Sequence, residues 1–431
     1  MNKTRRIVSP LAWVPSLYFA MGLPFVVLNM VSAVMFKDLG IQDAQIAFWT
    51  SLIMWPWTIK FLWSPFLELF RTKKFFVGAT QLLSGVMCGV AALSLHLPSF
   101  FAVTIAVFAV VAFSGATHDI AADGVYMSEL STRDQAKYIG WQGAFYNLAK
   151  LVATGGLVWF AGWLYERSSA AGAASFDAYV HAWTVVLAIL CGLLVLIGLY
   201  HAKMLPSGGA AAEKHSLREG LRGLREVIVA FFAKKHIWYY IAFIILYRLG
   251  EGFVMKIVPL FLKADTSIGG LGLSNQQIGL YYGSFGAGAF LLGSLLAGYF
   301  IAGRGLKRTL FTLCCIFNIP FAVYALLAFF QPSSMWLVAG GIILEYFGYG
   351  FGFVGLTLFM MQQVAPGKHQ MAHYAFASGI MNLSVMLTGA VSGYLSDWLG
   401  YKVFFLVVML TTIPAFVMTR LIPFTYPDEK K

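Results

Sequence analysis

Charged residues are scarce in this sequence. Asp, Glu, Lys and Arg make up 11% of its 431 residues, whereas hydrophobic residues make up 59%. A typical soluble domain contains about 25% charged residues and about 45–50% apolar ones. The sequence has too few polar side chains to cover the surface of a soluble fold of this size. The composition therefore excludes a cytosolic enzyme, a secreted disulfide-rich domain and a disordered scaffold. The sequence predicts an integral membrane protein.

Cysteine is also rare, and its positions argue against a chemical role. All four cysteines lie inside apolar runs: Cys88, Cys191, Cys314 and Cys315. We interpret them as small buried hydrophobic side chains rather than as disulfide partners or metal ligands. No metal site, cofactor or catalytic residue is predicted.

Long apolar segments are abundant instead. An α-helix needs about 20 mostly apolar residues to cross the hydrocarbon core of a bilayer. Twelve segments meet that requirement, in two groups of six: 11–36, 45–67, 75–97, 99–127, 138–165 and 180–202, then 237–262, 276–302, 308–330, 334–362, 370–396 and 402–422. The expected fold class is therefore an all-α membrane protein with twelve transmembrane helices.

The basic residues predict the orientation of these helices. If both termini face the cytoplasm, 22 Lys and Arg residues lie in cytoplasmic segments and 4 in outside loops. This asymmetry agrees with the positive-inside rule. The net charge of +12 is thus explained by short loops, and we expect no nucleic-acid partner, since binders of nucleic acid gather charge on one face of a soluble domain.

One polar connection, 203–236, separates the two groups of helices. It begins with a Pro-Ser-Gly-Gly linker, and Ser216 stands three residues before Glu219 in a capping-box pattern. The pattern predicts an amphipathic helix lying on the anionic inner membrane surface. The alternative is a solvated, charged linker.

An internal repeat relates the two groups. Asn147-Leu148 and Asn382-Leu383 are separated by 235 residues, as are Trp163-Leu164 and Trp398-Leu399. These matches predict two pseudo-symmetric six-helix halves, 1–202 and 237–431, joined by 203–236. In transporters built this way, the substrate site lies between the halves near the bilayer midplane.

Ionisable residues inside the predicted spans are the main candidates for function, because charges in a bilayer are costly and mark cavities or ion pairs. The set is balanced: Lys60, Lys150, Arg248 and Lys256 are positive, and Asp119, Asp123, Glu251 and Glu345 are negative. The four carboxylates are candidate proton-coupling groups. The four cations, together with Asn147, Asn382 and Tyr247, are candidate substrate-binding groups.

Two pairs have informative spacings. Asp119 and Asp123 are four residues apart, so they share one helix face and repel each other when both are charged, which suits proton uptake. Alternatively, both are ion-paired, with Lys150 as a candidate partner, and hold helices together. Arg248 and Glu251 are three residues apart and can pair on one face, and Gly250 and Gly252 beside them predict a loosened helix.

Three positions near these charges carry further predictions. Pro56 precedes Lys60 by one turn, which predicts a kinked second span. Glu345 is a second proton-site candidate, or else the partner of a cation. His118, beside Asp119, is either a proton relay or a hydrogen-bonded packing residue.

Several segments resemble the major facilitator superfamily and, within it, AmpG-type muropeptide permeases and related acetyl-CoA transporters. The resemblance covers nearly the whole chain and is carried by these segments: Gly22 to Pro24, Lys60 to Pro65 (KFLWSP), His118 to Gly124 (HDIAADG), Tyr247 to Glu251 (YRLGE) and Tyr374 to Leu383.

This resemblance implies a proton-driven importer of anhydro-muropeptides, which are cell-wall breakdown products, in the inner membrane of Gram-negative bacteria. By position, Lys60, Asp119, Asp123, Arg248 and Glu251 match the polar core of that family. The expected partners are protons, a small anionic substrate and the lipid bilayer, and the expected oligomeric state is monomeric.

Three alternatives remain open at this stage. A transporter of the same structural class is one of them, either a proton-coupled transporter of another anionic metabolite or an exporter of drugs or metabolites. A membrane-embedded acyltransferase requires a His/Asp or Ser/His arrangement, for which His118-Asp119 is the only adjacent pair. A channel fits less well, because duplicated halves with central charges suit alternating access.

Overall fold

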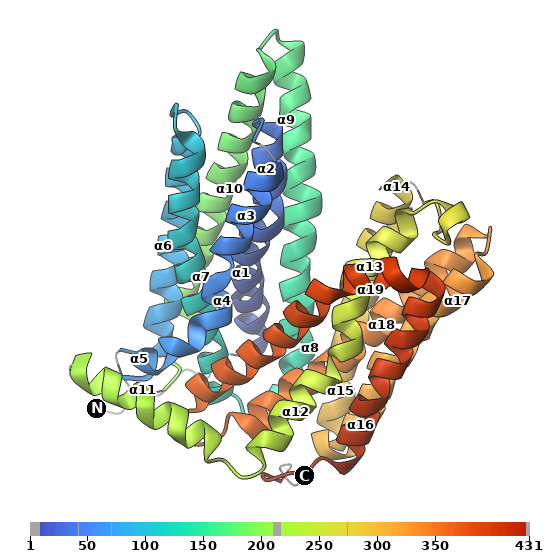
Figure 1. The fold of residues 1–431 in the computed structure, drawn as a ribbon. Helices are drawn as coiled ribbons and strands as arrows, with labels where there is room; N and C mark the ends of the chain where they lie inside the picture. The colour runs from blue at the N-terminus through green and yellow to red at the C-terminus, as the bar shows by residue number, and fades with distance from the viewer. Residues whose placement is uncertain (1–8, 42, 70, 210–216, 274, 428–431) are drawn as a thin grey trace. The chain divides into compact units, whose positions relative to one another are not determined.

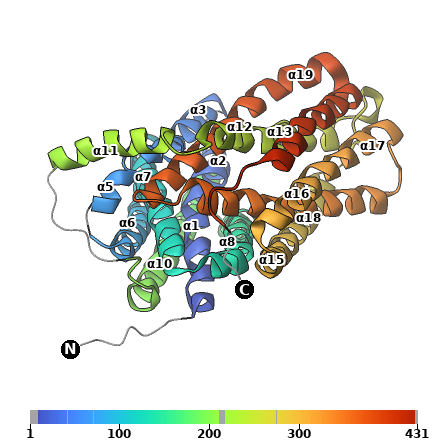
Figure 2. The ribbon, with the colours of Figure 1, turned by 90° about the horizontal axis from the view of Figure 1, so that it is seen from below.

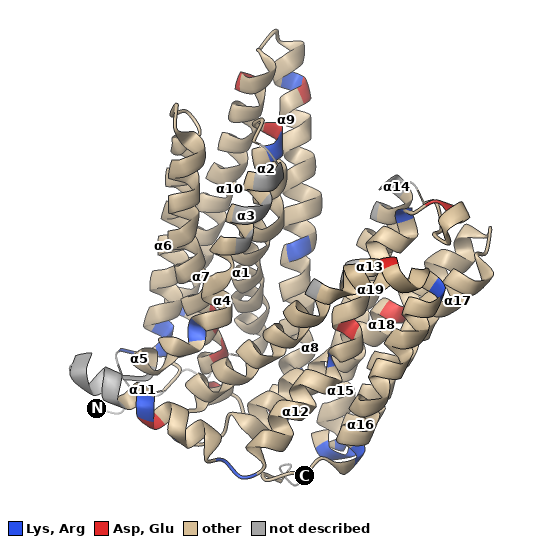
Figure 3. Cartoon of the chain, in the orientation of Figure 1, with Lys and Arg blue, Asp and Glu red and all other residues tan. Residues whose placement is uncertain are grey.

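The computed structural model describes residues 9–41, 43–69, 71–209, 217–273 and 275–427. Within these ranges the chain is helical and contains no β-strand. Tan, uncharged residues form most of every long helix in Figure 3. Helices suit such a sequence because a helix satisfies its own backbone hydrogen bonds, and lipid offers no other partner for them.

Residue contacts divide the chain into two compact units. The first comprises residues 1–129 and 145–224, and the second comprises residues 130–144 and 225–431. The helices within the first unit are α1 (Val14–Val26), α2 (Ser32–Asp38), α3 (Asp43–Ile53), α4 (Trp55–Ile59), α5 (Ser64–Leu69), α6 (Lys73–Ser94), α7 (Phe100–Glu129), α9 (Val158–Ala170) and α10 (Ser175–Met204). Two helices contribute to both units: α8 (Thr132–Leu151) and α11 (Leu217–Phe232).

The second unit holds the remaining helices. They are α12 (Ile237–Tyr247), α13 (Leu249–Lys263), α14 (Asn275–Ile278), α15 (Gly286–Arg304), α16 (Leu306–Asn318), α17 (Ala322–Phe330), α18 (Met335–Phe359) and α19 (Gln370–Leu421). The helix α19 merges two helices across Gly400, whose φ of 67° breaks the helical path.

The predicted spans correspond to these helices. Nine helical stretches in the described residues are long and apolar enough to cross a membrane. The other three predicted spans are helical as well: 45–67 falls on α3, α4 and α5, 237–262 falls on α12 and α13, and 370–396 is the continuous first part of α19. The arrangement is that of a twelve-span protein.

Long helices pack side by side within each unit. In the first, α6 lies against both α7 and α10 (Figure 1). In the second, α18 lies against α15 and α16, as Figure 2 shows from below. A Cβ added at Gly350 would meet the Phe290 carbonyl oxygen at 2.2 Å. The helices α15 and α18 can approach so closely only because residue 350 is glycine.

Large apolar side chains on the outside agree with a lipid environment. Trp336, Tyr394 and Trp398 expose 85%, 83% and 80% of their surfaces. In a soluble protein such exposure would be a liability, whereas Trp and Tyr are enriched at membrane interfaces.

A helix forms at the predicted amphipathic segment. It is α11, which begins directly after Ser216, a residue outside the described ranges. In the second unit its Val227 and Phe231 are buried, Phe231 stacks on Phe376 of α19, and Lys234 donates hydrogen bonds to the carbonyl oxygens of Val364 and Pro366, at 2.6 Å each. Burial lowers the pKa of Lys234, in this connection, to about 8. The end of the connection is therefore anchored by packing and by hydrogen bonds.

Candidate functional site

A buried polar cluster in the first unit joins three separate segments. Lys60 Nζ lies 3.5 Å from Asp119 Oδ2, and the two residues expose only 5% and 8% of their surfaces. Asp123, one turn further along α7, accepts a hydrogen bond of 2.9 Å from the hydroxyl of Tyr18 on α1. The ammonium of Lys60 also acts electrostatically on Asp123. One cation therefore serves two carboxylates that share a helix face.

Local sequence explains why Lys60 reaches this position. Pro56 lies in the first turn of α4, and the chain passes through a short 3₁₀ turn, Lys60–Leu62, before α5 begins. The predicted kink in the second span is thus confirmed. Trp63 fixes the far side of the kink, because its indole N–H donates a 3.0 Å hydrogen bond to Thr117 Oγ1 on α7. The kink places the Lys60 ammonium against α7.

Several buried polar atoms of this cluster lack a hydrogen-bond partner among the described residues. They are Asp119 Oδ1, Trp57 Nε1 and both ring nitrogens of His118. The indole N–H of Trp57 interacts with the Asp119 carboxylate, which leaves the two ring nitrogens of His118 as the atoms without a candidate partner among the described residues. Buried polar atoms are almost always hydrogen-bonded in proteins, so such a group indicates a place for water or a ligand.

A second buried cluster, in the second unit, is built on a break between two helices. Arg248 separates α12 from α13 and has a non-helical backbone, with φ −102° and ψ 8°. Its Nε and Nη2 atoms donate to the two carboxylate oxygens of Glu251, as the spacing predicts. The guanidinium lies 5.1 Å from the ring centre of Phe353, and Tyr349 acts on both charges. Arg248 is therefore held on its edge and on its face.

The glycines beside this pair have a different role from the one the sequence suggests. A Cβ at Gly252 would meet Thr388 Oγ1 at 1.8 Å, and one at Gly250 would meet Thr412 Cγ2 at 2.8 Å. Both threonines belong to α19. These glycines let α13 pack closely on α19, while the break itself is at Arg248.

Glu345 on α18 is held by a neutral partner. It exposes 4% of its surface and accepts a 2.7 Å hydrogen bond from the hydroxyl of Tyr324. Tyr346 and Tyr282 surround it, with ring centres 4.9 Å apart. Among the described residues no Lys or Arg forms an ion pair with Glu345, and its charge interacts with that of Glu251. The group bonded to Glu345 in the described residues is thus a tyrosine and not a cation.

The other predicted site residues lie outside these two clusters or are already engaged. Lys150 is exposed, so the cation beside Asp119 is Lys60 and not Lys150. Asn382 is exposed and Asn147 is partly buried. Tyr247 is fully buried and donates to the Gly352 carbonyl oxygen at 2.9 Å. The Lys256 side chain lies outside the part of the chain that the structure describes.

Sequence reasoning missed two tyrosines and one tryptophan. Tyr18, Tyr324 and Trp57 complete the two clusters, yet none of them is charged. The sequence does contain an indication of them, because each places one polar atom inside a long apolar run. A buried Tyr or Trp usually finds a hydrogen-bond partner. Nothing in the sequence says which carboxylate that partner is.

The described residues hold no group of three or more His, Cys, Asp or Glu side chains placed to bind a metal ion. In the described part of the chain, the two clusters combine carboxylates with one cation each and show no nucleophile beside an activating base of the kind that enzymes use.

Comparisons with known proteins agree with this reading. The chain is 24% identical over 411 residues to the anhydromuropeptide permease of Escherichia coli K12, covering 93% of this chain and 77% of the permease. It is 27% identical over 199 residues to a putative transporter, AmpG 2, of Rickettsia felis, covering 44% of this chain and 45% of that one. A crystal structure of the E. coli fucose:proton symporter FucP has the same fold, with a TM-score of 0.71, 12% identity and coverage of 95% and 98% of the two chains.

The family model of the Major Facilitator Superfamily matches residues 16–364 and 244–431, which together span nearly the whole chain. Twelve helical spans, buried charges within them and this match lead to one conclusion. The protein is a multi-pass membrane transporter for a small molecule, not an enzyme, and it belongs to the Major Facilitator Superfamily.

Proposed function

We propose that this transporter imports anionic cell-wall breakdown products, anhydro-muropeptides or related amino-sugar peptides, by proton-coupled alternating access. The similarity to an anhydromuropeptide permease over 93% of the chain supports the substrate class. The buried cluster of Lys60, Asp119 and Asp123 is the observation that carries the coupling mechanism.

Charge balance supports a proton in this cluster. Two buried carboxylates face one ammonium, and a buried charge without a partner costs several kcal/mol. A proton on one carboxylate neutralises the cluster. When an anionic substrate approaches Lys60, it competes with Asp119 for the ammonium and leaves that carboxylate in need of a second proton. Substrate binding and proton uptake therefore favour each other.

Exchange of partners is easier here because the ion pair is loose. The Lys60–Asp119 separation of 3.5 Å exceeds the about 2.7–2.9 Å of a strong charge-assisted hydrogen bond. In the second unit, Arg248 is held by two hydrogen bonds to Glu251 and by Phe353, so releasing it costs more. We therefore assign Asp119 and Asp123 to coupling, and Glu345 to a second proton site.

We assign substrate contacts according to the unit in which each candidate side chain lies and whether it is already bonded there. Lys60 and the exposed Lys150 both belong to the first unit, as does Asn147, and all three can meet an anionic sugar-peptide from that unit. Arg248, Lys256, Tyr247 and Asn382 are the corresponding candidates on the second unit. Because Tyr247 and Arg248 are already bonded within their own unit, their contribution is to shape the site.

The test is uptake by purified protein in liposomes with an imposed inward proton gradient. A labelled anhydro-muropeptide is followed, with the free anhydro-sugar as competitor and a protonophore as control. Accumulation that the protonophore abolishes supports the proposal. An outward flux driven by the same gradient would identify an exporter, and no flux of muropeptide in either direction would overturn the substrate class.

We further propose that the protein is a monomer of the bacterial inner membrane with both termini in the cytoplasm, and that 1–202 and 237–431 are duplicated halves joined by 203–236. The distribution of basic residues supports the orientation. Fusing a reporter that is active only in the cytoplasm to either end tests it. Activity at both ends is the expected result.

A further inference from the structure

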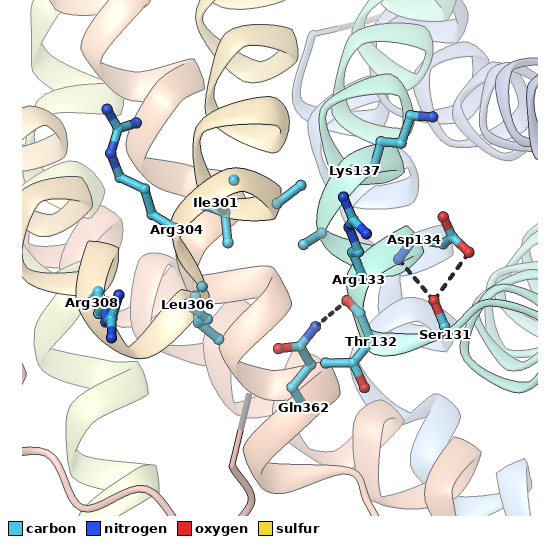
Figure 4. Close-up of a pocket in the computed structure, with 14 residues that line it drawn as sticks. Ser131, Thr132, Arg133, Asp134, Lys137, Ile301, Arg304, Leu306, Arg308 and Gln362 are labelled. Carbon is cyan, nitrogen blue, oxygen red and sulfur yellow. Dashed lines mark hydrogen bonds between the residues drawn. The ribbon is translucent and has the colours of Figure 1, made fainter. Parts of the chain in front are cut away.

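A cavity of about 810 Å³ lies in the second unit, where α8 begins and α15 turns into α16 (Figure 4). It is separate from the Arg248 and Glu345 clusters, which contribute no residue to it. The described residues that line it include four basic side chains and one carboxylate: Arg133, Lys137, Arg304, Arg308 and Asp134.

Backbone geometry brings the basic side chains to two facing walls. Arg133 and Lys137 are four residues apart and share a face of α8. Arg304 ends α15, and the single residue Gly305, with φ 84°, turns the chain directly into α16. This corner carries Arg304 and Arg308 on the wall opposite α8, as Figure 4 shows.

The one carboxylate in the lining is used locally. Asp134 Oδ2 accepts a 3.0 Å hydrogen bond from the hydroxyl of Ser131, and the Ser131 oxygen accepts one of 3.1 Å from the Asp134 backbone N–H. The two residues therefore cap the start of α8. The first turn of α16 has no side-chain cap, and its residues Gly305 and Leu306 form part of the wall. A helix N-terminus carries partial positive charge, so the field in the cavity is positive.

Arg304 on this corner packs against an aromatic ring. The guanidinium of Arg304 lies 4.5 Å from the ring centre of Phe300. This contact does not use up the N–H donors of the guanidinium, and those donors match phosphate oxygens in a bidentate arrangement.

We propose that this cavity binds a phosphate-bearing anion, either the headgroup of an anionic phospholipid or a soluble phosphate. Inside it the anion accepts hydrogen bonds from Arg304 and Arg308 on one wall and from Arg133 and Lys137 on the other. A third part of the lining, the turn Met360–Val364, is already joined to the start of α8 by a 3.0 Å hydrogen bond from the Gln362 side-chain amide to the Thr132 carbonyl oxygen. The proposal is independent of the transported substrate.

The experiment measures thermal unfolding of the purified full-length protein under two conditions. In detergent, inorganic phosphate is titrated against chloride at equal ionic strength. In nanodiscs, phosphatidylglycerol is compared with phosphatidylcholine. The variants are R304Q/R308Q and, in case that pair folds poorly, K137Q alone. The control is R420Q, which removes an exposed arginine outside the cavity.

We expect the wild-type protein and R420Q to be stabilised by phosphate, by phosphatidylglycerol or by both. In R304Q/R308Q the phosphate concentration for half-maximal stabilisation rises about tenfold or more, or the lipid effect is lost, because charge-assisted hydrogen bonds are removed. Stabilisation in detergent identifies a soluble phosphate, and stabilisation only by phosphatidylglycerol identifies a lipid headgroup. No stabilisation of the wild type by either anion, or equal stabilisation of wild type, R304Q/R308Q and K137Q, would overturn the proposal.

Discussion

The two buried charge clusters have similar composition and different construction. Each contains one cation beside a carboxylate in the described residues: Lys60 lies beside Asp119, with Asp123 one turn away, and Arg248 is paired with Glu251. In the first, a kink brings Lys60 from another segment to within 3.5 Å of α7. In the second, Arg248 and Glu251 are three residues apart and form two hydrogen bonds with each other.

This difference separates a pair that can exchange partners from one that holds the structure. The Lys60–Asp119 pair has a single long contact, and the other polar neighbour of Asp119 is the uncharged indole of Trp57. Arg248 is bound on its edge by Glu251 and on its face by Phe353. We infer that the first cluster moves protons and substrate, whereas the second fixes the junction of α12 and α13.

The largest expected effect is on transport by Asp119→Asn. Because this variant removes the carboxylate that exchanges with the substrate, gradient-driven accumulation should fall to the level reached without a gradient. Uptake in liposomes measures it. The variant keeps one cation, Lys60, facing one carboxylate, Asp123, so the cluster stays balanced, and size-exclusion chromatography of the purified variant checks that it folds. Uptake by Asp119→Asn with unchanged pH dependence would move the coupling role to another carboxylate.

The next effect is on stability, and here the larger change is expected in the second cluster. Arg248→Gln leaves Glu251 buried without its partner, which costs about 3–5 kcal/mol of unfolding free energy. Lys60→Gln should cost less, because its contact is longer. Denaturant unfolding in detergent compares the two, and Arg248→Met with Glu251→Met should recover most of the loss. Equal losses at both sites would contradict the distinction between the clusters.

A smaller effect is expected at the two tyrosines. Tyr324→Phe and Tyr18→Phe each remove one hydrogen bond to a buried carboxylate, at a cost of about 1–3 kcal/mol. Tyr18→Phe should change the pH dependence of uptake more than Tyr324→Phe, because Asp123 belongs to the exchanging cluster and Glu345 is only the second proton site. An altered pH profile in Tyr324→Phe alone would instead assign the coupling to Glu345.

The smallest effect on stability is expected for Lys150→Gln. This side chain is exposed and forms no ion pair with the described residues, so the variant should change the unfolding free energy by about 0.5 kcal/mol or less. Its KM for an anionic muropeptide should rise while the maximal rate stays near that of the wild type. An unchanged KM would remove Lys150 from the substrate site.

The spans were predictable because their signal is local. Apolar runs of about 20 residues specify membrane helices almost regardless of what surrounds them, and Pro56 specified the kink at Lys60. The Arg248–Glu251 pair was predictable for the same reason, since a spacing of three residues settles the geometry.

The partner of Asp119 was not predictable in this way. Lys60 and Lys150 are both basic residues within spans, and only the packing of the kinked second span on α7 decides between them. Tyr18 and Tyr324 were missed because an uncharged residue in an apolar run does not show which helix it faces. The basic cavity depends on α8 meeting the corner at Gly305, a contact between residues far apart in the sequence.

The most direct test of the two-cluster account is the proton flux that accompanies substrate entry. A pH-sensitive dye inside liposomes reports acidification when anhydro-muropeptide is added, without any imposed gradient. The account predicts acidification in the wild type and in Arg248→Met with Glu251→Met, and none in Asp119→Asn. Acidification that persists in Asp119→Asn and disappears when the Arg248–Glu251 pair is removed would contradict it.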